Sequence, residues 1–282
     1  MTHYSPTVRR RRLSVLLRRY REQTGKTADE IAKILEWTPS TVTRMERGEW
    51  RRPSLDALKS LLHVYGVTDP EERLAVLALA REARQRGWWE EYKDIWGVRS
   101  LPEFEAEATR ILAYRTLLVP GLLQTADYAR AVVRGGKVLN GGVIERRVRA
   151  RLERQRILNR GKPPFLWALI DEAALRKRVG GAETMAAQVR HIAEMATRPN
   201  IAIQVITDEA GAHAAMEGPF TILQFSGDPP LVHVEMLAGE RYLELPGEVD
   251  TYTVAYDHVR ASALSADASV EFLANLADQL LK

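Results

Sequence analysis

The feature that most constrains this chain is a series of four short helical patterns in its first 66 residues, three of them followed by a glycine. In residues 8–23, apolar side chains recur at helical spacing, and Gly25 follows. Thr27 then has the position of a capping-box residue, because Glu30 stands three residues later. Helices this short need tertiary packing to be stable. The pattern therefore predicts a cluster of small helices around one shared core.

The second and third helices of this cluster are expected to form a helix-turn-helix. Thr38 is expected to cap the third helix, Pro39 suits its first turn, and Gly48 suits its left-handed end. A fourth helix should begin after Ser54 and stop at Gly66. In such a pair, inside a cluster of four to five helices, the second helix enters the major groove of DNA. The N-terminal part is thus expected to be a mostly α, DNA-binding domain.

Residues 27–48, TADEIAKILEWTPSTVTRMERG, resemble the lambda-repressor/Cro-like (XRE) family of helix-turn-helix proteins. The resemblance rests on the pair Ile31 and Ala32, on the apolar Trp37 and on the run STVTRMERG that ends the motif. One departure is Ala28, because members of the family often carry at this position a glutamine that contacts phosphate. Thr27 or a backbone N–H would have to replace that contact.

The outward-facing polar residues of the third helix are candidates for DNA contacts. Serine and threonine can contact bases or phosphates, and arginine can hold guanine in a bidentate grip. We expect base-edge contacts from Ser40, Thr41, Thr43 and Arg44, and phosphate contacts from Arg47, Arg51 and Arg52, with Thr27 as a further contact. The alternative is that these are ordinary solvated side chains. Glu46 is expected to be structural and to pair with a nearby arginine, because phosphate would repel a carboxylate.

Residues 9–12 are four consecutive arginines with two interpretations. They could be a flexible arm that adds nonspecific affinity for DNA. They could equally be the solvated first turn of a helix.

The charges of the chain are unevenly distributed. Residues 1–86 hold 18 basic and 11 acidic side chains, whereas the remainder holds 23 basic and 26 acidic ones. A basic head suggests a polyanionic partner such as DNA. The absence of cysteine excludes thiol nucleophiles, disulfides and thiolate zinc sites. No apolar run approaches the ~18 residues of a membrane span, and no signal peptide is recognisable, so we expect a cytoplasmic protein with no membrane partner.

After the basic head, a change in hydrophobic period predicts an α+β domain. Helical patterns at 103–114 and 143–160 precede strand-like runs, and two helices are expected at 248–263 and 266–281. The strand-like runs are residues 165–170, 201–207, 220–225, 231–236 and 241–245. Strands grouped between helices favour a mixed or antiparallel sheet of four to five strands. The predicted division is a helix-turn-helix domain at 1–66, a connecting helix and linker at 67–100, and an α+β regulatory and dimerisation domain at 101–282.

The resemblance extends over essentially the whole chain. Its segments are GWW at 87–89, residues 105–129 with the distinctive PGLLQT, PNIAIQVI at 199–206, VHVEMLAGERYLE at 232–244, and the last part of the chain. They are similar to a class of actinobacterial regulators of the WhiJ type, which join an XRE-type head to a C-terminal antitoxin-like domain. This implies transcriptional control of development or secondary metabolism. It also implies a small acidic partner protein, encoded by a neighbouring gene, that antagonises the regulator.

Candidates for ligand or partner contacts in the larger domain lie in the segment 232–244. They are His233, Glu235, Arg241, Tyr242 and Glu244. The first two stand two positions apart in an expected strand and so share a face. The alternative is that all five are exposed polar strand residues.

Signs of enzymatic chemistry are weak. No phosphate loop, dinucleotide fingerprint, nucleophile elbow or HExxH motif is present. The pairs His213 with Glu217, and His233 with Glu235, are poor metal-site signals. We expect no catalytic residue, no metal and no cofactor.

The resulting hypothesis is a sequence-specific transcriptional regulator that binds a double-stranded operator as a homodimer. Its two half-sites would lie about 34–36 Å apart, or a multiple of that. The C-terminal domain would dimerise the chain and receive a signal, either a metabolite or, as an antitoxin-like domain, a small protein. An enzyme regulated by its own DNA-binding head is the remaining alternative.

Overall fold

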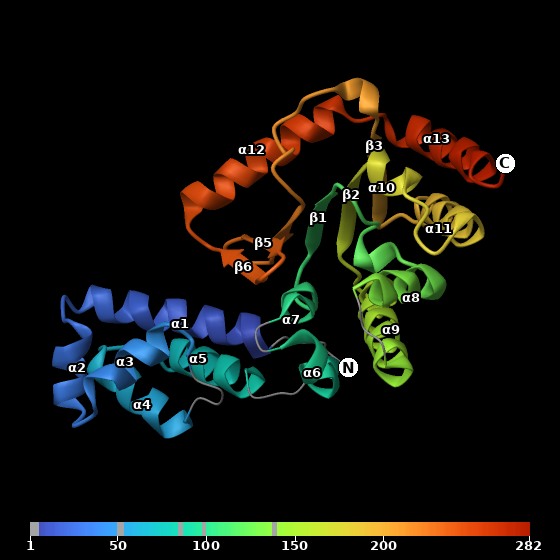
Figure 1. The fold of residues 1–282 in the computed structure, drawn as a ribbon. Helices are drawn as coiled ribbons and strands as arrows, with labels where there is room; N and C mark the ends of the chain where they lie inside the picture. The colour runs from blue at the N-terminus through green and yellow to red at the C-terminus, as the bar shows by residue number, and fades with distance from the viewer. Residues whose placement is uncertain (1–5, 50–53, 84–86, 98–99, 137–139) are drawn as a thin grey trace. The chain divides into compact units, whose positions relative to one another are not determined.

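The protein is described here by a computed structural model that covers residues 6–49, 54–83, 87–97, 100–136 and 140–282 (Figure 1). The chain forms two compact units, Met1–Glu107 and Ala108–Lys282. Each unit has its own buried apolar core.

The first unit is helical, as the short capped patterns predict. In chain order its helices are α1 (Pro6–Gln23), α2 (Ala28–Ile34), α3 (Pro39–Glu46), α4 (Leu55–Val64), α5 (Pro70–Glu82), the 3₁₀ turn η1 (Trp88–Tyr92), α6 (Lys93–Trp96) and α7 (Leu101–Glu105). Helices α2, α3 and α4 gather at one end of the α1–α5 pair (Figure 1). Their common core contains five fully buried residues, Leu17, Ile31, Val42, Leu61 and Ala80. Helix α5 contributes to that core, so it is packed into the helix cluster.

Local sequence signals set the ends of these helices. The capping box at Thr27 is confirmed, because its side chain accepts from the Glu30 backbone N–H while the Glu30 carboxylate accepts from the Thr27 backbone. The side chain of Ser54 accepts from the Ala57 backbone in the same way. Gly48 and Gly66 are in the left-handed region at φ 68° and 73°. Glycine reaches that region without the steric penalty that a Cβ brings.

The second unit is an α+β domain around a six-stranded mixed sheet of strand order β3-β2-β1-β4-β5-β6. Strands β1 (Arg110–Arg115), β2 (Phe165–Asp171) and β3 (Ile201–Ile206) are parallel. Strands β4 (Phe220–Gln224), β5 (Leu231–Met236) and β6 (Gly239–Leu243) continue the sheet antiparallel. The carboxyl ends of the three parallel strands therefore open at one edge of the sheet.

Helices cover this sheet and connect its parallel strands. The 3₁₀ turn η2 (Gly121–Leu123), α8 (Ala126–Gly135), α9 (Gly141–Gln155) and η3 (Arg156–Asn159) lead from β1 to β2, and α10 (Glu172–Arg176) and α11 (Ala182–Met195) lead from β2 to β3. The turn η4 (Asp208–Ala210) follows β3, and α12 (Pro246–Ser262) and α13 (Ala266–Gln279) end the unit. Helix α12 packs Tyr256 and Val259 against Tyr114 and Phe220 of the sheet. Burial on both sides explains why β1 and β2 are almost continuously apolar.

One element was predicted wrongly. Residues 103–114 are not one helix, because α7 ends at Glu105 and β1 begins at Arg110. The apolar run Ile111–Tyr114 resembles a helix in its spacing, but all four residues are buried because β1 is a central strand between β2 and β4. The mixed sheet is confirmed, and β1 is the strand that raises its number from the expected four to five to six.

The distinctive PGLLQT segment is held by amide side chains. Gln124 donates from Nε2 to the Val119 carbonyl at 2.7 Å, and Gln155 donates to the carbonyls of Gly121 and Gln124 at 2.9 and 2.7 Å. Gln188, which is fully buried, donates to the Leu123 carbonyl at 2.7 Å. These bonds satisfy backbone carbonyls of the 3₁₀ turn η2 and of the residues on either side of it, so the segment has a structural role.

Candidate nucleic-acid interface

The turn between α2 and α3 fixes the angle of the helix-turn-helix. Leu35 ends α2, and Glu36 then takes φ 55°, the one left-handed non-glycine residue in the described part of the chain. The Trp37 backbone N–H donates to the Ala32 carbonyl at 2.8 Å, and the Trp37 side chain packs against the core. The turn therefore aims α3 through backbone geometry and one apolar anchor.

Helix α3 has a buried face and a polar face. Val42 and Met45 are buried in the core. The polar residues Ser40, Thr43, Arg44 and Arg47 follow the spacing i, i+3, i+4 and i+7, so they share the opposite face. Ser40, Arg44 and Arg47 are exposed, while Thr41 and Thr43 are half-buried. This face presents hydroxyls at its start and guanidinium groups toward its end.

The start of α3 differs in one detail from the expected cap. Thr38 holds the N-cap position, but its side chain makes no capping bond. Its hydroxyl instead lies 2.8 Å from the Thr41 hydroxyl and 3.4 Å from that of Ser40. The first turn contains no acidic residue, and the N–H groups of a helix start favour an anion. This end of α3 is therefore chemically suited to phosphate or to base acceptors.

Glu46 is turned into a network at the end of α3, as predicted. Its Oε1 accepts from Arg21 Nε at 2.8 Å and from the Tyr65 hydroxyl at 3.3 Å, and its side chain is only 8% exposed. The hydrogen bond to Glu46 raises the pKa of Arg21, and burial raises the pKa of Tyr65 above its ordinary value. The carboxylate is neutralised within the unit, which leaves the exposed face of α3 without a negative charge.

Thr27 is exposed, and its hydroxyl is engaged in the capping box, 3.0 Å from Glu30 Oε2. The backbone N–H of Thr27 lowers the pKa of Glu30, which therefore stays ionised beside it. The predicted phosphate contact of Thr27 remains a prediction. Arg51 and Arg52 lie outside the described residues.

Neither interpretation of the arginine run describes Arg9 and Arg10. Both lie within α1, and Arg9 pairs with Glu82 at 3.4 Å and Glu107 at 3.3 Å. Arg10 Nη2 lies 3.9 Å from Glu103. Their side chains are 16% and 14% exposed. Part of the basic excess is thus used inside the first unit, because long arginine side chains can pack along apolar surface while pairing at their ends.

In the second unit, the structure brings together only some of the candidates in the segment 232–244. His233 on β5 is 1% exposed, and its Nε2 lies 2.8 Å from Oε2 of Glu240, which is not among the predicted site residues. Tyr242 is the cross-strand partner of His233, with ring centroids 5.0 Å apart. His233 is therefore a buried residue of the β5–β6 hairpin, whereas Arg241 is exposed on β6.

Glu235 lies on the same strand in an arginine-rich environment. Desolvation of its carboxylate by the surrounding protein would by itself raise the pKa of Glu235, although the residue keeps exposed surface. The nearby charges of Arg115, His233, Arg154 and Arg151 outweigh this effect and hold the pKa below its usual range. Glu235 therefore belongs to a local charge network. Glu244 follows β6 and is half-buried.

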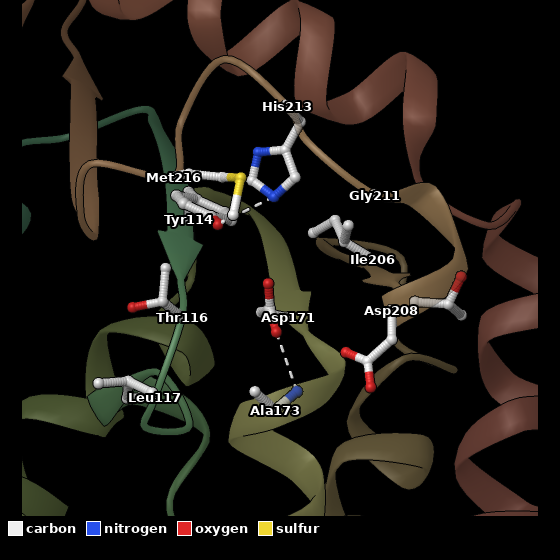
Figure 2. Close-up of a pocket in the computed structure, with 11 residues that line it drawn as sticks. Tyr114, Thr116, Leu117, Asp171, Ala173, Ile206, Asp208, Gly211, His213 and Met216 are labelled. Carbon is white, nitrogen blue, oxygen red and sulfur yellow. Dashed lines mark hydrogen bonds between the residues drawn. The ribbon is translucent and has the colours of Figure 1, made fainter.

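A cavity of about 400 Å³ lies at the carboxyl ends of the three parallel strands (Figure 2). Its lining includes Tyr114, Asp171, Asp208 and His213, none of which was predicted as a site residue. A signal was present in the sequence, because each of the runs at 165–170 and 201–207 is followed directly by an aspartate. What the sequence could not give was the neighbour relation of the strands.

Neither a cluster of metal ligands nor a membrane-spanning helix occurs among the described residues. They contain no group of three or more histidine, cysteine, aspartate or glutamate side chains placed to hold a metal ion. Among the helices that the structure describes, none combines the length and the apolar character needed to cross a membrane.

Comparison with known families agrees with the division into two kinds of domain. Residues 12–76 match a helix-turn-helix domain, and residues 98–275, more than half of the chain, match the domain of unknown function DUF5753. No curated protein and no solved structure matches the chain. The chain belongs to the DUF5753 family, and its N-terminal part is a DNA-binding helix-turn-helix domain of a regulator.

Proposed function

We propose that the protein is a sequence-specific transcriptional regulator that reads operator DNA in the major groove with α3. The observation that carries this proposal is the division of α3 into a buried stripe and a polar face with Ser40, Thr43, Arg44 and Arg47. Arg44 and the hydroxyls near it are the base-reading groups, and Arg47 binds phosphate. Action on the chromosome would place the protein in the cytoplasm.

The direct test is an Arg44→Ala variant in a gel-shift titration with operator DNA selected from a random pool. Loss of one bidentate base contact is expected to weaken specific binding by about 1–3 kcal/mol, or roughly 5- to 150-fold. Arg190→Ala is the matched control, because Arg190 is an exposed helical arginine of the second unit. Unchanged operator affinity in the Arg44 variant, with circular dichroism intact, would contradict the proposal.

We also propose that the DUF5753 domain dimerises the chain, so that two copies of α3 meet the half-sites of a pseudo-palindrome. Equilibrium sedimentation of the full chain tests this, since a purely monomeric protein at the concentrations of DNA binding would exclude it. The resemblance to WhiJ-type regulators supports control of development or secondary metabolism.

A second mode of control is favoured by the charge of α9. Arg149 and Arg156 are exposed and stand seven positions apart, so they share one face along and just beyond this helix, and such a surface suits the small acidic protein that the family resemblance implies. Co-purification with the product of a neighbouring gene, lost in an Arg149→Glu/Arg156→Glu variant, is the expected result. If the variant still co-purifies with the partner, the partner does not bind at α9.

A further inference from the structure

The cavity in the second unit lies where ligands bind in open sheets with parallel strands. Tyr114 is near the end of β1, Asp171 ends β2 and Ile206 ends β3, and all three line it (Figure 2). In such sheets, the region beyond the carboxyl ends of the strands is the usual ligand site. The volume of about 400 Å³ falls within the range for small-molecule pockets.

The charged lining of the cavity is predominantly acidic. Asp171 and Asp208 are its carboxylates, and among the described residues that line it there is no lysine or arginine. Asp171 also caps α10, because its Oδ1 accepts from the Ala173 backbone N–H at 2.9 Å. Glu172 is buried and is not among the lining residues. It accepts from the Asp208 backbone N–H at 3.0 Å and pairs with Arg176. An anionic ligand would be repelled here, and a cation attracted.

A hydrogen-bonding pair of a tyrosine and a histidine stands beside the carboxylates. The Tyr114 side chain is fully buried, and its hydroxyl lies 3.4 Å from His213 Nε2. Burial and the charge of Asp171 raise the pKa of Tyr114 above its ordinary value, so this hydroxyl keeps its proton. Figure 2 shows the Asp171 carboxylate and the Tyr114 hydroxyl directed into the same space.

Apolar side chains form a further part of the lining. Ile206 is buried at the base, while Leu117 and Met216 are 57% and 64% exposed. The segment between β3 and β4 carries Asp208, His213 and Met216, and Gly211 within it has φ 64°. Apolar side chains combined with a few placed polar groups are typical of the lining of small-molecule sites.

We propose that this cavity binds a small organic cation, an ammonium group carried on an apolar or aromatic body. The ammonium donates to Asp171 and Asp208, and the apolar body packs on Ile206, Leu117 and Met216. A bare metal ion fits less well, because the described residues offer no three-ligand group there or elsewhere. Binding itself does not depend on the DNA contacts, whereas a role of the ligand as the regulatory signal rests on the proposed function.

The test uses three probes with one indole body: tryptamine, which is cationic, tryptophol, which is neutral, and indole-3-acetate, which is anionic. Isothermal titration of the full chain is expected to give saturable binding in the order tryptamine, tryptophol, indole-3-acetate. The variants Asp171→Asn and Asp208→Asn keep side-chain size, and asparagine still caps a helix. Each is expected to weaken tryptamine about tenfold while leaving tryptophol unchanged.

Asp278→Asn is the control, because Asp278 is an exposed carboxylate on α13 outside the cavity lining. The proposal is overturned if tryptamine shows no saturation up to its solubility limit, if indole-3-acetate binds as tightly, or if both aspartate variants bind tryptamine like the parent. Operator affinity measured with and without tryptamine is a separate readout. If the chain binds tryptamine but no operator, the proposed function fails and the cavity assignment stands.

Discussion

The two units of this protein place their charges in opposite ways. On α3, Arg44 and Arg47 are exposed on a helix face whose reverse side is buried, and Glu46 is neutralised by Arg21. In the second unit, Asp171 and Asp208 line a concave space at the ends of parallel strands. An exposed basic face suits a large polyanion, whereas a concave acidic space suits a small cation. The comparison teaches that the two proposed partners, DNA and a small cation, require surfaces of opposite charge and different shape.

The largest expected effect tests whether the two cores are energetically separate. Leu61 and Leu169 are fully buried leucines, one in each unit, so each alanine substitution should cost its own unit about 2–5 kcal/mol. Hydrogen exchange should show loss of protection in α4 for Leu61→Ala and in β2 for Leu169→Ala. Leu74→Ala, at a leucine that is 61% exposed, is the control and should change little. Equal loss of protection in both units from either core variant would show that they unfold as one.

A smaller effect sharpens the account of charge on α3. Glu46→Gln removes the negative charge that Arg21 and Tyr65 share, and the expected loss of unfolding free energy is about 1.5–3 kcal/mol. Glu22→Gln is the matched control, since its pair with Arg18 is exposed and should contribute below about 1 kcal/mol. Thermal unfolding of the two variants measures the difference. Equal melting temperatures of the two variants would show that the charge of Glu46 does not stabilise the first unit.

The smallest effect concerns the turn of the helix-turn-helix. A left-handed conformation costs a residue with a Cβ about 1–2 kcal/mol, and glycine adds a smaller entropic cost in the unfolded chain. Glu36→Gly at φ 55° is therefore expected to stabilise the first unit by about 0.5 kcal/mol. Gly66→Ala is the reverse experiment, because Gly66 has φ 73° and no atom within 4 Å of an added Cβ. It should destabilise by about 1 kcal/mol, and the same sign for both variants would refute the backbone explanation.

Prediction from the sequence succeeded where the interacting residues are close together along the chain. The capping box at Thr27, the glycine at position 48 and the inward positions Val42 and Met45 of α3 depend on neighbours within one or two helical turns. It failed at β1, because the run Ile111–Tyr114 has a spacing that fits a helix as well as a buried strand. Only pairing with β2 on one side and β4 on the other distinguishes the two.

The sequence by itself determined the helix-turn-helix, its polar and buried faces, and the α+β character of the remainder, because caps and hydrophobic periods act locally. Tertiary structure alone decided that β1 is a central strand, that Arg9 and Arg10 pair within the first unit, and that His233 is buried beside Glu240. It also decided that Tyr114, Asp171 and Asp208 meet at one cavity. The physical reason is that strand order and long-range ion pairs join residues far apart in the chain, and no local pattern of side chains specifies which strands become neighbours.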